Sequence, residues 1–409
     1  MKRASLCSGV LGLLTFLVIG HVFAATPIPG TCGMEISAPG SYTLQNDILN
    51  CYPASGPIAA ITISANDVVL DLNGHTLSGL GTYQGFGVFI NGASNVTVKK
   101  GTITNFAQGV LFLTRTDSSG DHNPAHVFIS NNKILNNLRG LFGNRTGSLE
   151  DLKAENNEIS GNSAGAIVLY NAVAGTIQGN VLCNNGKYGV SLSNSVSMVI
   201  RGNTMTNNTN GVVFYASSND NGVSQNAFCN NYNGILIYSG RNNSIALNNF
   251  IENRGHQAYD ADRNLWKNNF WSDQRNCPNP YIINAATGAE DSEPRCSAWP
   301  DAPSCECVGN GSICGSKFDD LNENGHWEDN EPGLGGWTID LEGPVTMSAI
   351  TEPDGSYCFV DLPPGIYTVR EVLKPGWRQT FPPDGKYVID QTKGENEGDI
   401  DFGNFQIPR

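Results

Sequence analysis

Asparagine recurs at a fixed interval of 23 residues between Asp151 and Asp273, and this interval constrains the fold more than any other feature. One ladder reads Asn157, Asn180, Asn203, Asn226 and Asn249, and an apolar side chain stands two residues after each member. A second ladder runs in phase and reads Asn162, Asn185, Asn208 and Asn231. The interval is too short for a pair of helices or a propeller blade, and it matches one coil of short strands and turns. The pattern predicts a parallel β-helix.

Stacked coils lie about 4.8 Å apart, so residues at equivalent positions contact one another. Asparagine suits the corners because its amide can donate to one neighbouring coil and accept from the other. Cys183 and Cys229 share a coil position with Thr206 between them, which puts their Cα atoms roughly 9.6 Å apart. That distance is beyond disulfide reach. We therefore expect both to be free, buried and inert thiols.

The remaining cysteines of the mature chain lie outside the regular coils. Cys32 and Cys51, and also Cys277 and Cys296, are close enough in sequence to form local bridges. A zinc site built from Cys305, Cys307 and Cys314 is the alternative for that cluster. Disulfides are favoured, because the chain starts with a secretory signal and an exported protein meets an oxidising compartment.

That signal covers residues 1–24, with Lys2 and Arg3 ahead of an apolar core from Val10 to Val22. Its removal changes the formal net charge from -14 to -16. An acidic protein is a poor partner for nucleic acid or an anionic membrane. Residues 93–153 nevertheless carry a net charge of +3, whereas residues 315–409 carry -11. If the protein meets an acidic polymer, the early coils are the expected place. We predict a secreted, extracellular or cell-surface protein that has no membrane contact after cleavage.

The chain divides by composition into five segments. We predict an all-β protein in which a right-handed parallel β-helix precedes a small antiparallel β-sandwich. The expected segments are the signal (1–24), an N-terminal cap (25–60), the β-helix (61–275), a Cys- and Pro-rich linker (276–314) and the sandwich (315–409). The aromatic stretch that contains Trp266 and Trp271 is predicted to plug the end of the coil stack. A sugar-stacking platform is the alternative and would need these tryptophans to be exposed.

One coil is too long. Ile103 and Ile134 take successive rung positions but are 31 residues apart, and the excess falls in the polar stretch from Leu113 to His126. Insertions at coil turns are where solenoids often carry function. The candidate catalytic residues are therefore those of this loop and the bases near it: Arg115, Asp117, Asp121, His122, His126, Lys99 and Arg139. A solvated loop with ordinary surface charges explains the same residues without catalysis.

The Asn-rich coils, the opening Leu70-Asp71-Leu72-Asn73-Gly74-His75 and the closing Asn269-Phe270-Trp271-Ser272-Asp273 resemble the right-handed β-helix superfamily of carbohydrate-binding and sugar-hydrolase proteins. That superfamily is similar to pectate lyases in fold and includes a periplasmic copper-enzyme maturation protein. The resemblance implies the fold and leaves the activity open. The few Met and His residues show no copper-ligand spacing, so no copper site is expected.

Residues 315–409 resemble the B-type domain of serine-aspartate-repeat surface adhesins, through Lys317-Phe318-Asp319-Asp320, Leu362-Pro363-Pro364-Gly365-Ile366-Tyr367 and Asp401-Phe402-Gly403-Asn404. The stretch from Asp320 to Glu331 also satisfies the spacing of a calcium loop. We predict a structural Ca²⁺ site with the ligands Asp320, Asn322, Asn324, His326, Glu328 and Glu331. An acidic loop without metal is the alternative.

Related sandwich domains close an isopeptide bond between a Lys and an Asn with the help of a Glu. Lys317, Asn404 and Glu371 stand in the corresponding strands, although B-type domains usually lack the bond.

Three functions fit the sequence. The first is a β-helix with a carbohydrate-facing surface beside a calcium-stabilised sandwich spacer, its partner a polysaccharide or cell-surface glycan. The second is a polysaccharide lyase, hydrolase or epimerase that acts on an acidic glycan at the long loop. The third is a structural or adhesive surface protein with no glycan ligand.

Overall fold

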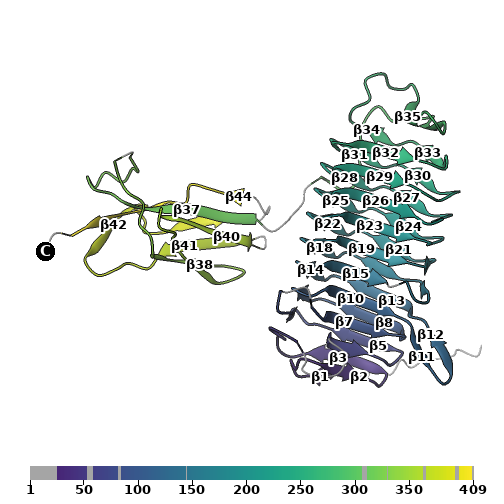
Figure 1. The fold of residues 1–409 in the computed structure, drawn as a ribbon, viewed down its shortest axis with the longest axis horizontal. Coiled ribbons are helices and arrows are strands. Elements are labelled where there is room, and N and C mark those ends of the chain that lie inside the picture. Colours follow the sequence, from purple (N-terminus) through teal and green to yellow (C-terminus); the bar gives the residue numbers. More distant parts are fainter. Residues whose placement is uncertain are drawn as a thin grey trace, which may run out of the picture.

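A computed structural model describes residues 25–52, 59–81, 84–143, 145–305, 311–328, 330–362, 365–391 and 396–407. The predicted signal, residues 1–24, lies outside this range. The β-helix forms as expected, with short strands stacked coil on coil (Figure 1). None of the described residues forms a helix with the length and apolarity needed to cross a membrane.

Three sheets form the walls of the β-helix, and almost all of their strand pairs are parallel. Sheet A contains β1 (Thr26–Ile28), β3 (Gly40–Leu44), β5 (Val68–Asp71), β8 (Ser94–Lys99), β13 (Ala125–Ser130), β17 (Lys153–Glu155), β21 (Thr176–Gln178), β24 (Val199–Arg201), β27 (Gly222–Ser224), β30 (Ser244–Ala246), β33 (Leu265–Lys267), β36 (Ala289–Asp291) and β35 (Tyr281–Asn284), with β16 (Leu149–Glu150) and β20 (Ala172–Val173) at its side. Strands therefore begin at Thr26, within the residues predicted to be a cap.

Sheet B contains β2 (Met34–Ile36), β4 (Ala59–Ile63), β7 (Phe86–Asn91), β10 (Gln108–Leu113), β15 (Arg139–Gly143), β19 (Gly165–Tyr170), β23 (Tyr188–Ser193), β26 (Asn210–Tyr215), β29 (Asn233–Ile237) and β32 (His256–Asp260). Sheet C contains β6 (Thr76–Ser78), β9 (Thr102–Thr104), β14 (Lys133–Leu135), β18 (Glu158–Ser160), β22 (Val181–Cys183), β25 (Thr204–Thr206), β28 (Ala227–Cys229), β31 (Asn249–Ile251) and β34 (Phe270–Trp271). The inward side chains of all three sheets form one continuous apolar core.

The asparagine ladders are hydrogen-bonded columns. In the first, both the backbone N–H and the side-chain Nδ2 of Asn180 donate to Oδ1 of Asn203, and Asn203 donates in the same way to Asn226. The side chains of these residues are fully buried. The column starts at Asn132 and ends on the carboxylate of Asp291. The ladder residues are structural, as the sequence predicts.

The ladder prediction is wrong at its fifth member. Asn226 donates to Asn248, not to Asn249, because the coil is 22 residues long at this point. Asn249 instead opens β31 opposite Ala227, and the rung residue opposite Phe228 is Phe250 rather than Ile251. The second ladder is confirmed and continues from Asn231 to Asn253.

A stack of aromatic rings closes the far end of the core. Trp271 lies 4.3 Å from Phe250 and 4.1 Å from Tyr281, measured between ring centroids, and both contacts are nearly parallel. Trp266 and Trp271 are each 1% exposed. The predicted plug is confirmed, and the alternative of a tryptophan sugar platform is wrong because no ring face of either residue is available to a ligand.

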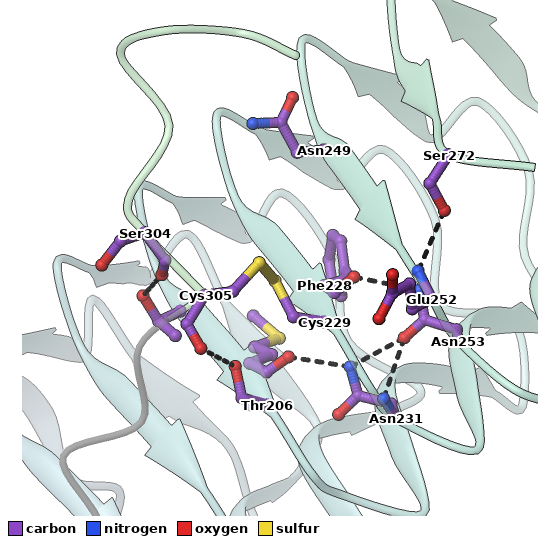
Figure 2. Close-up of a disulfide and its surroundings, with 12 residues drawn as sticks. Thr206, Phe228, Cys229, Asn231, Asn249, Glu252, Asn253, Ser272, Ser304 and Cys305 are labelled. Atoms are coloured by element: carbon purple, nitrogen blue, oxygen red, sulfur yellow. Dashed lines mark hydrogen bonds between the residues drawn. A yellow bond between two sulfur atoms is a disulfide. The ribbon is translucent and has the colours of Figure 1, made fainter. Parts of the chain in front are cut away.

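Residues 297–305 form a strap over the outer side of sheet C. Trp299 and Asn249 exchange two hydrogen bonds, and Thr204 donates to the carbonyl of Ser304 at 3.0 Å. Cys305 is bonded to Cys229, as Figure 2 shows beside Thr206. The strap explains why these outward side chains of sheet C are buried.

The cysteine predictions have mixed outcomes. The bridges Cys32–Cys51 and Cys277–Cys296 are confirmed. Thr206 separates Cys183 from Cys229 in the register, so the exclusion of a bridge between them stands. The prediction that both are free thiols is wrong, because each is disulfide-bonded. Equivalent positions on different coils are too far apart to bridge, but the strap crosses the coils and brings Cys305 to Cys229.

The zinc alternative is also wrong, since Cys305 pairs with Cys229 and Cys314 pairs with Cys358. Cys307, the third proposed ligand, lies outside the described residues.

The C-terminal domain is a sandwich of two small sheets, as predicted. One contains β40 (Ser356–Leu362), β37 (Gly311–Asp319), β45 (Phe402–Gln406) and β42 (Trp377–Phe381), with β44 (Asn396–Glu397) paired to β37. The other contains β39 (Met347–Ile350), β38 (Thr338–Glu342), β41 (Ile366–Glu371) and β43 (Tyr387–Asp390). Most pairs are antiparallel, but the first strand β37 runs parallel to the last strand β45.

We predict that replacing Asn203 with Leu destabilises the β-helix. The change nearly preserves side-chain volume but removes the acceptor of two buried donors of Asn180. Each buried donor left unsatisfied costs about 1–3 kcal/mol, so the free energy of unfolding should fall by about 3 kcal/mol or more. Denaturant unfolding followed by circular dichroism measures this. The exposed Gln178→Leu on a neighbouring coil is the control and should change stability by less than about 0.5 kcal/mol. Equal effects of the two substitutions would contradict the role of the ladder.

Candidate functional site

The long coil forms a projecting hairpin, as predicted. Ile103 and Ile134 pair directly, and the excess residues fold into β11 (Arg115–Asp117) and β12 (Gly120–His122), which leave the stack after β10 (Figure 1). The hairpin brings together Arg115, Asp117 and His122. Asp117 lies 3.5 Å from Nε of Arg115 and 3.1 Å from Nε2 of His122. Four of the seven candidate residues thus share one small element.

The charged side chains of this hairpin are engaged in hydrogen bonds with the hairpin or the coil stack. Asp121 accepts a hydrogen bond from Thr116 at 2.7 Å, and Nη1 of Arg115 donates to the carbonyl of Ser64 at 2.9 Å. The hydroxyl and N–H of Ser119 both donate to Asp117. These two hydrogen bonds, and then that of His122, hold the pKa of Asp117 well below its usual range. A carboxylate held ionised in this way is a weak proton acceptor, so the hairpin resembles a fixed structural element more than a general base.

The other three candidates lie elsewhere. His126 pairs with Asp151 at 2.9 Å on sheet A, and Lys99 pairs with Asp71 at 3.5 Å on the same sheet. Arg139 belongs to β15 of sheet B, where its guanidinium lies 4.7 Å from the ring centre of Phe142. Four of the seven residues therefore lie in the hairpin and three lie elsewhere, so the seven do not form one catalytic group.

The outer face of sheet B was not predicted as a site. One column of outward side chains runs in register along eight coils: Phe89, Leu111, Phe142, Val168, Ser191, Val213, Leu236 and Tyr259. Seven of these eight side chains are apolar or aromatic. Most are shielded from water although they point away from the core. Phe86, Leu113 and Phe142 pack against the cluster that contains Phe89 and Leu111. We call this surface the aromatic face.

Tyrosines form the exposed layer of the aromatic face. The rings of Tyr215 and Tyr238 stack with centroids 5.4 Å apart, and Tyr238 contacts Tyr259 at 6.0 Å. Tyr188 meets Tyr215 edge to face at 6.4 Å. Tyr238 is 50% exposed, so part of its ring is open to solvent. The result is a row of aromatic rings that crosses several coils.

A shallow cavity of about 300 Å³ opens at the end of this row. It is lined by Tyr232, Asn233, Leu236, Tyr238, Gly255, His256 and Tyr259. Tyr232, at 59% exposure, and Tyr238 form its aromatic walls, while Asn233 and His256 add polar groups. Burial, and then the hydrogen bond with Tyr188, raises the pKa of Tyr215, so its hydroxyl stays protonated over the physiological range.

The sequence did contain a signal for this face. A strand with one face in water alternates apolar and polar residues, whereas the run Gly211-Val212-Val213-Phe214-Tyr215 is apolar at both inward and outward positions. The outward members are what builds the aromatic face.

The predicted calcium loop is compact. Asp320 is fully buried, and its two carboxylate oxygens accept hydrogen bonds from the backbone N–H groups of Asn324 and Gly325. Asn322 and Asn324 each donate a side-chain amide hydrogen to Glu328. Glu331 accepts from the N–H of Leu321 at 3.0 Å, and the N–H of His326 donates to Asn324. The loop thus brings the oxygen-bearing side chains of the predicted set together, and His326 takes part through its backbone N–H.

Asp319 supplies a separate indication of a cation at this loop. Its Oδ1 is buried and makes no hydrogen bond. Burial, partly offset by Lys317, and then the negative charges of Glu331 and Asp320 raise the pKa of this carboxyl. A divalent cation beside these oxygens would relieve that repulsion, and oxygen ligands are those that Ca²⁺ prefers. The oxygen-bearing side chains of the loop are therefore of the chemical type that binds calcium.

Across the described ranges, including the described part of the calcium loop, no group of three or more His, Cys, Asp or Glu is arranged to hold a metal ion. His75, His122 and His126 each pair with an aspartate instead of gathering around one point.

Comparison with known proteins gives matches for both domains. The family model described as "Periplasmic copper-binding protein (NosD)" matches residues 61–287, more than half of the 409-residue chain. The model described as "SdrD B-like domain" matches residues 311–403. No curated protein matches the chain significantly.

Several solved structures match the chain at low sequence identity and low TM-score. The A-module of Azotobacter vinelandii mannuronan C-5 epimerase AlgE4 is 14% identical, with a TM-score of 0.36 over 57% of this chain and 79% of that one. Tailspike protein 3 of bacteriophage CBA120 is 11% identical, with a TM-score of 0.38 over 77% of this chain and 59% of the tailspike. DFA-IIIase from Arthrobacter chlorophenolicus A6, without its lid and in complex with GF2, is 13% identical, with a TM-score of 0.32 over 56% of this chain and 59% of that one.

We predict that Ser119→Ala raises the pKa of Asp117 toward the ordinary range of an aspartate. In the native hairpin the lowered pKa keeps this carboxylate ionised further into the acid range, and the Ser119 hydroxyl is the first cause. An NMR titration of the side-chain carboxyl carbon measures the shift. Thr116→Val is the control, because Thr116 contacts Asp121 and should leave Asp117 unchanged. An unchanged Asp117 titration in Ser119→Ala would refute this account of the hairpin.

Proposed function

This chain belongs to the periplasmic copper-binding protein (NosD) family, and we propose that its β-helix binds a carbohydrate polymer along the aromatic face of sheet B. The observation that carries the proposal is the row of tyrosines Tyr215, Tyr238 and Tyr259 on the outward side of sheet B, in which Tyr238 is 50% exposed. Large apolar or aromatic side chains exposed together on a protein surface usually serve a ligand or a partner.

The shape of this face suits an extended ligand. The column crosses eight coils, which corresponds to about 34 Å at the spacing of neighbouring strands. A small molecule would be held in one enclosed pocket, whereas this surface is long and shallow. A polymer can lie along it and contact several coils at once.

The chemistry of the face suits sugars. A pyranose ring presents apolar C–H faces that pack on aromatic rings and hydroxyls that need hydrogen-bond partners. The stacked rings of Tyr215 and Tyr238 offer aromatic faces for the C–H groups of a sugar. Their hydroxyls and Asn233 offer hydrogen-bond partners for its hydroxyls. Arg139 and Arg145 lie over Phe142 and Tyr170, at the same face, and add positive charge. An acidic polysaccharide or cell-surface glycan is therefore the proposed partner.

The family description names copper, and the described residues of this chain do not fit a copper site. Copper is held by clustered His, Cys or Met side chains. The histidines of the β-helix are spread over different coils, and Cys229 is consumed by a disulfide. We assign no step to copper.

An enzymatic function at the hairpin is the second candidate, as a polysaccharide lyase, hydrolase or epimerase. The cluster of Arg115, Asp117 and His122 directly after β10 favours it, because a polymer on the aromatic face would end beside these charges. The saturated hydrogen bonds of Asp117 oppose it. We therefore propose binding first and catalysis second.

We also propose that the protein is extracellular or periplasmic. The bridges Cys32–Cys51, Cys229–Cys305 and Cys277–Cys296 are of the kind that persists in oxidising compartments. A glycan partner is found in the same compartments.

The C-terminal domain is proposed to bind one structural Ca²⁺ at residues 320–331. The carboxylates of Asp320 and Glu331, the carboxamide oxygens of Asn322 and Asn324, and Glu328 would hold the ion, with the His326 carbonyl as the remaining expected ligand. The buried, unpaired Oδ1 of Asp319 supports a cation here. The ion would supply positive charge that fixes the loop.

We predict that Tyr215→Ala and Tyr238→Ala weaken glycan binding by about tenfold each, which corresponds to about 1.4 kcal/mol. Affinity electrophoresis in gels with pectate, alginate or chondroitin measures retention. Tyr52→Ala, an exposed tyrosine outside the aromatic face, is the control and should bind normally. Incubation with the same polymers and assays for unsaturated and reducing ends test the enzymatic candidate. Absence of both retention and product would leave the purely structural or adhesive function.

We predict that calcium raises the unfolding temperature of the C-terminal domain and that Asp320→Asn removes the effect. A hundredfold excess of free ion over its Kd stabilises a domain by about 2.7 kcal/mol. Calorimetry with calcium and with EDTA measures the difference. Asp384→Asn makes the same charge change at an exposed aspartate outside the loop and should preserve the response. An identical transition with and without calcium would contradict the site.

A further inference from the structure

A buried amine, a buried carboxyl group and a buried carboxamide meet inside the C-terminal sandwich. Lys317 of β37 and Asn404 of β45 are each 0% exposed, and the side chain of Glu371 of β41 is 1% exposed. Lysine and glutamate are almost never fully buried without a specific reason. Burial of these three polar side chains costs free energy, and apolar packing alone does not explain why they are buried here.

The three side chains reach one another from both sheets. β37 and β45 pair in parallel, with Lys317 opposite Phe402 and Asp319 opposite Asn404, so Lys317 and Asn404 lie on one face of the same sheet. Glu371 comes from the facing sheet, and its Oε2 lies 3.3 Å from Nζ of Lys317. The carboxamide of Asn404 lies next to the same carboxylate.

As free side chains, Asn404 and Glu371 do not have complete hydrogen bonding. Neither Nδ2 nor Oδ1 of Asn404 completes a hydrogen bond, and the carboxylate oxygens of Glu371 do not complete one either. Buried polar groups almost always find partners, and each one left without costs about 1–3 kcal/mol. Four such atoms around one lysine amine indicate that the free side chains are not the final state of this site.

We propose that Lys317 and Asn404 become joined by an intramolecular isopeptide bond, with Glu371 as the proton carrier. The amine Nζ attacks Cγ of Asn404, a new Nζ–Cγ amide bond forms, and the Cγ–Nδ2 bond breaks. Glu371, as the neutral acid, delivers its proton to Nδ2, which leaves as ammonia, and takes up the proton that the amine nitrogen loses. No oxidant or other reactant is required, and Glu371 is returned to its starting state.

The surroundings favour the reactive protonation states. Burial lowers the pKa of Lys317 to about 8 and raises the pKa of Glu371, so the neutral amine and neutral acid are both within reach. The lysine is also fixed in place, because its Nζ donates to the carbonyl of Phe402 at 2.9 Å and lies 4.7 Å from the ring centre of Trp337. A nucleophile that is held and desolvated beside a proton acceptor is an activated one.

The bond would connect the first and last strands of the domain. Since β37 and β45 are neighbours in one sheet, a covalent link between them would carry tension directly from one end of the domain to the other. The Cys314–Cys358 disulfide pins the same strand β37 to its other neighbour β40. The sandwich would then resist unfolding by pulling.

Peptide mass spectrometry of the full-length protein tests the bond. After reduction and alkylation of the disulfides, a protease digest should yield one cross-linked species that joins the Lys317 and Asn404 peptides and is lighter than their sum by one ammonia. Fragmentation should place the link at these two residues, and trypsin should not cleave after Lys317. Recovery of the two peptides separately with unmodified masses would overturn the proposal, and this readout needs no variant.

Variants assign the roles. Glu371→Gln should leave the peptides unlinked, whereas Glu342→Gln, the same change at an exposed glutamate of the neighbouring strand β38, should leave the link intact. Asn404→Asp should give a link formed with loss of water instead of ammonia, which identifies Cγ as the attacked atom. Full linkage in Glu371→Gln would remove Glu371 from the mechanism.

Discussion

Hydrogen bonds between asparagine side chains of successive coils are the interaction on which this β-helix depends. At each corner the backbone turns through left-handed conformations and cannot satisfy all of its polar groups within one coil. The asparagine supplies the missing acceptor to the coil before it and two donors to the coil after it, as at Asn203. Every bond in a column points the same way. The column therefore needs an acceptor with no donor requirement at its end, and a carboxylate, Asp291, meets that need.

The same bonds set how much of the fold could be predicted. A residue that must contact its equivalent in the next coil recurs at the coil length, so the asparagine spacing gave the fold, the second ladder and the over-long coil. It failed where the coil shortened by one residue, because Asn248 and Asn249 are adjacent and only geometry distinguishes them. The strap over sheet C could not be predicted for a related reason. Its residues lie outside the repeat, and only the folded chain brings Cys305 to Cys229.

The candidate site was much less predictable from the sequence than the fold. The hairpin that the over-long coil predicts is present, but Arg115 and Asp117 pair with each other, and Arg115 also donates to the carbonyl of Ser64 two coils away. The aromatic face lies where the repeat holds. Because residues in a coil stack produce columns, a single outward position such as that of Val213 is repeated on each coil and becomes a surface. A regular scaffold can thus carry a ligand site without any irregularity to mark it.

The two domains handle buried polarity in different ways. In the β-helix each buried amide finds another amide at a fixed distance, and the repeat itself supplies the partner. The sandwich has no repeat, so the side chains of Glu371 and Asn404 depend on Lys317, whose amine also donates to the carbonyl of Phe402. An ion pair accounts for two of them but leaves the carboxamide unsatisfied. Conversion of the amine and the carboxamide into one amide reduces the number of buried polar groups that need hydrogen-bond partners. The β-helix meets the same need without a covalent bond, because its repeat places one asparagine above another.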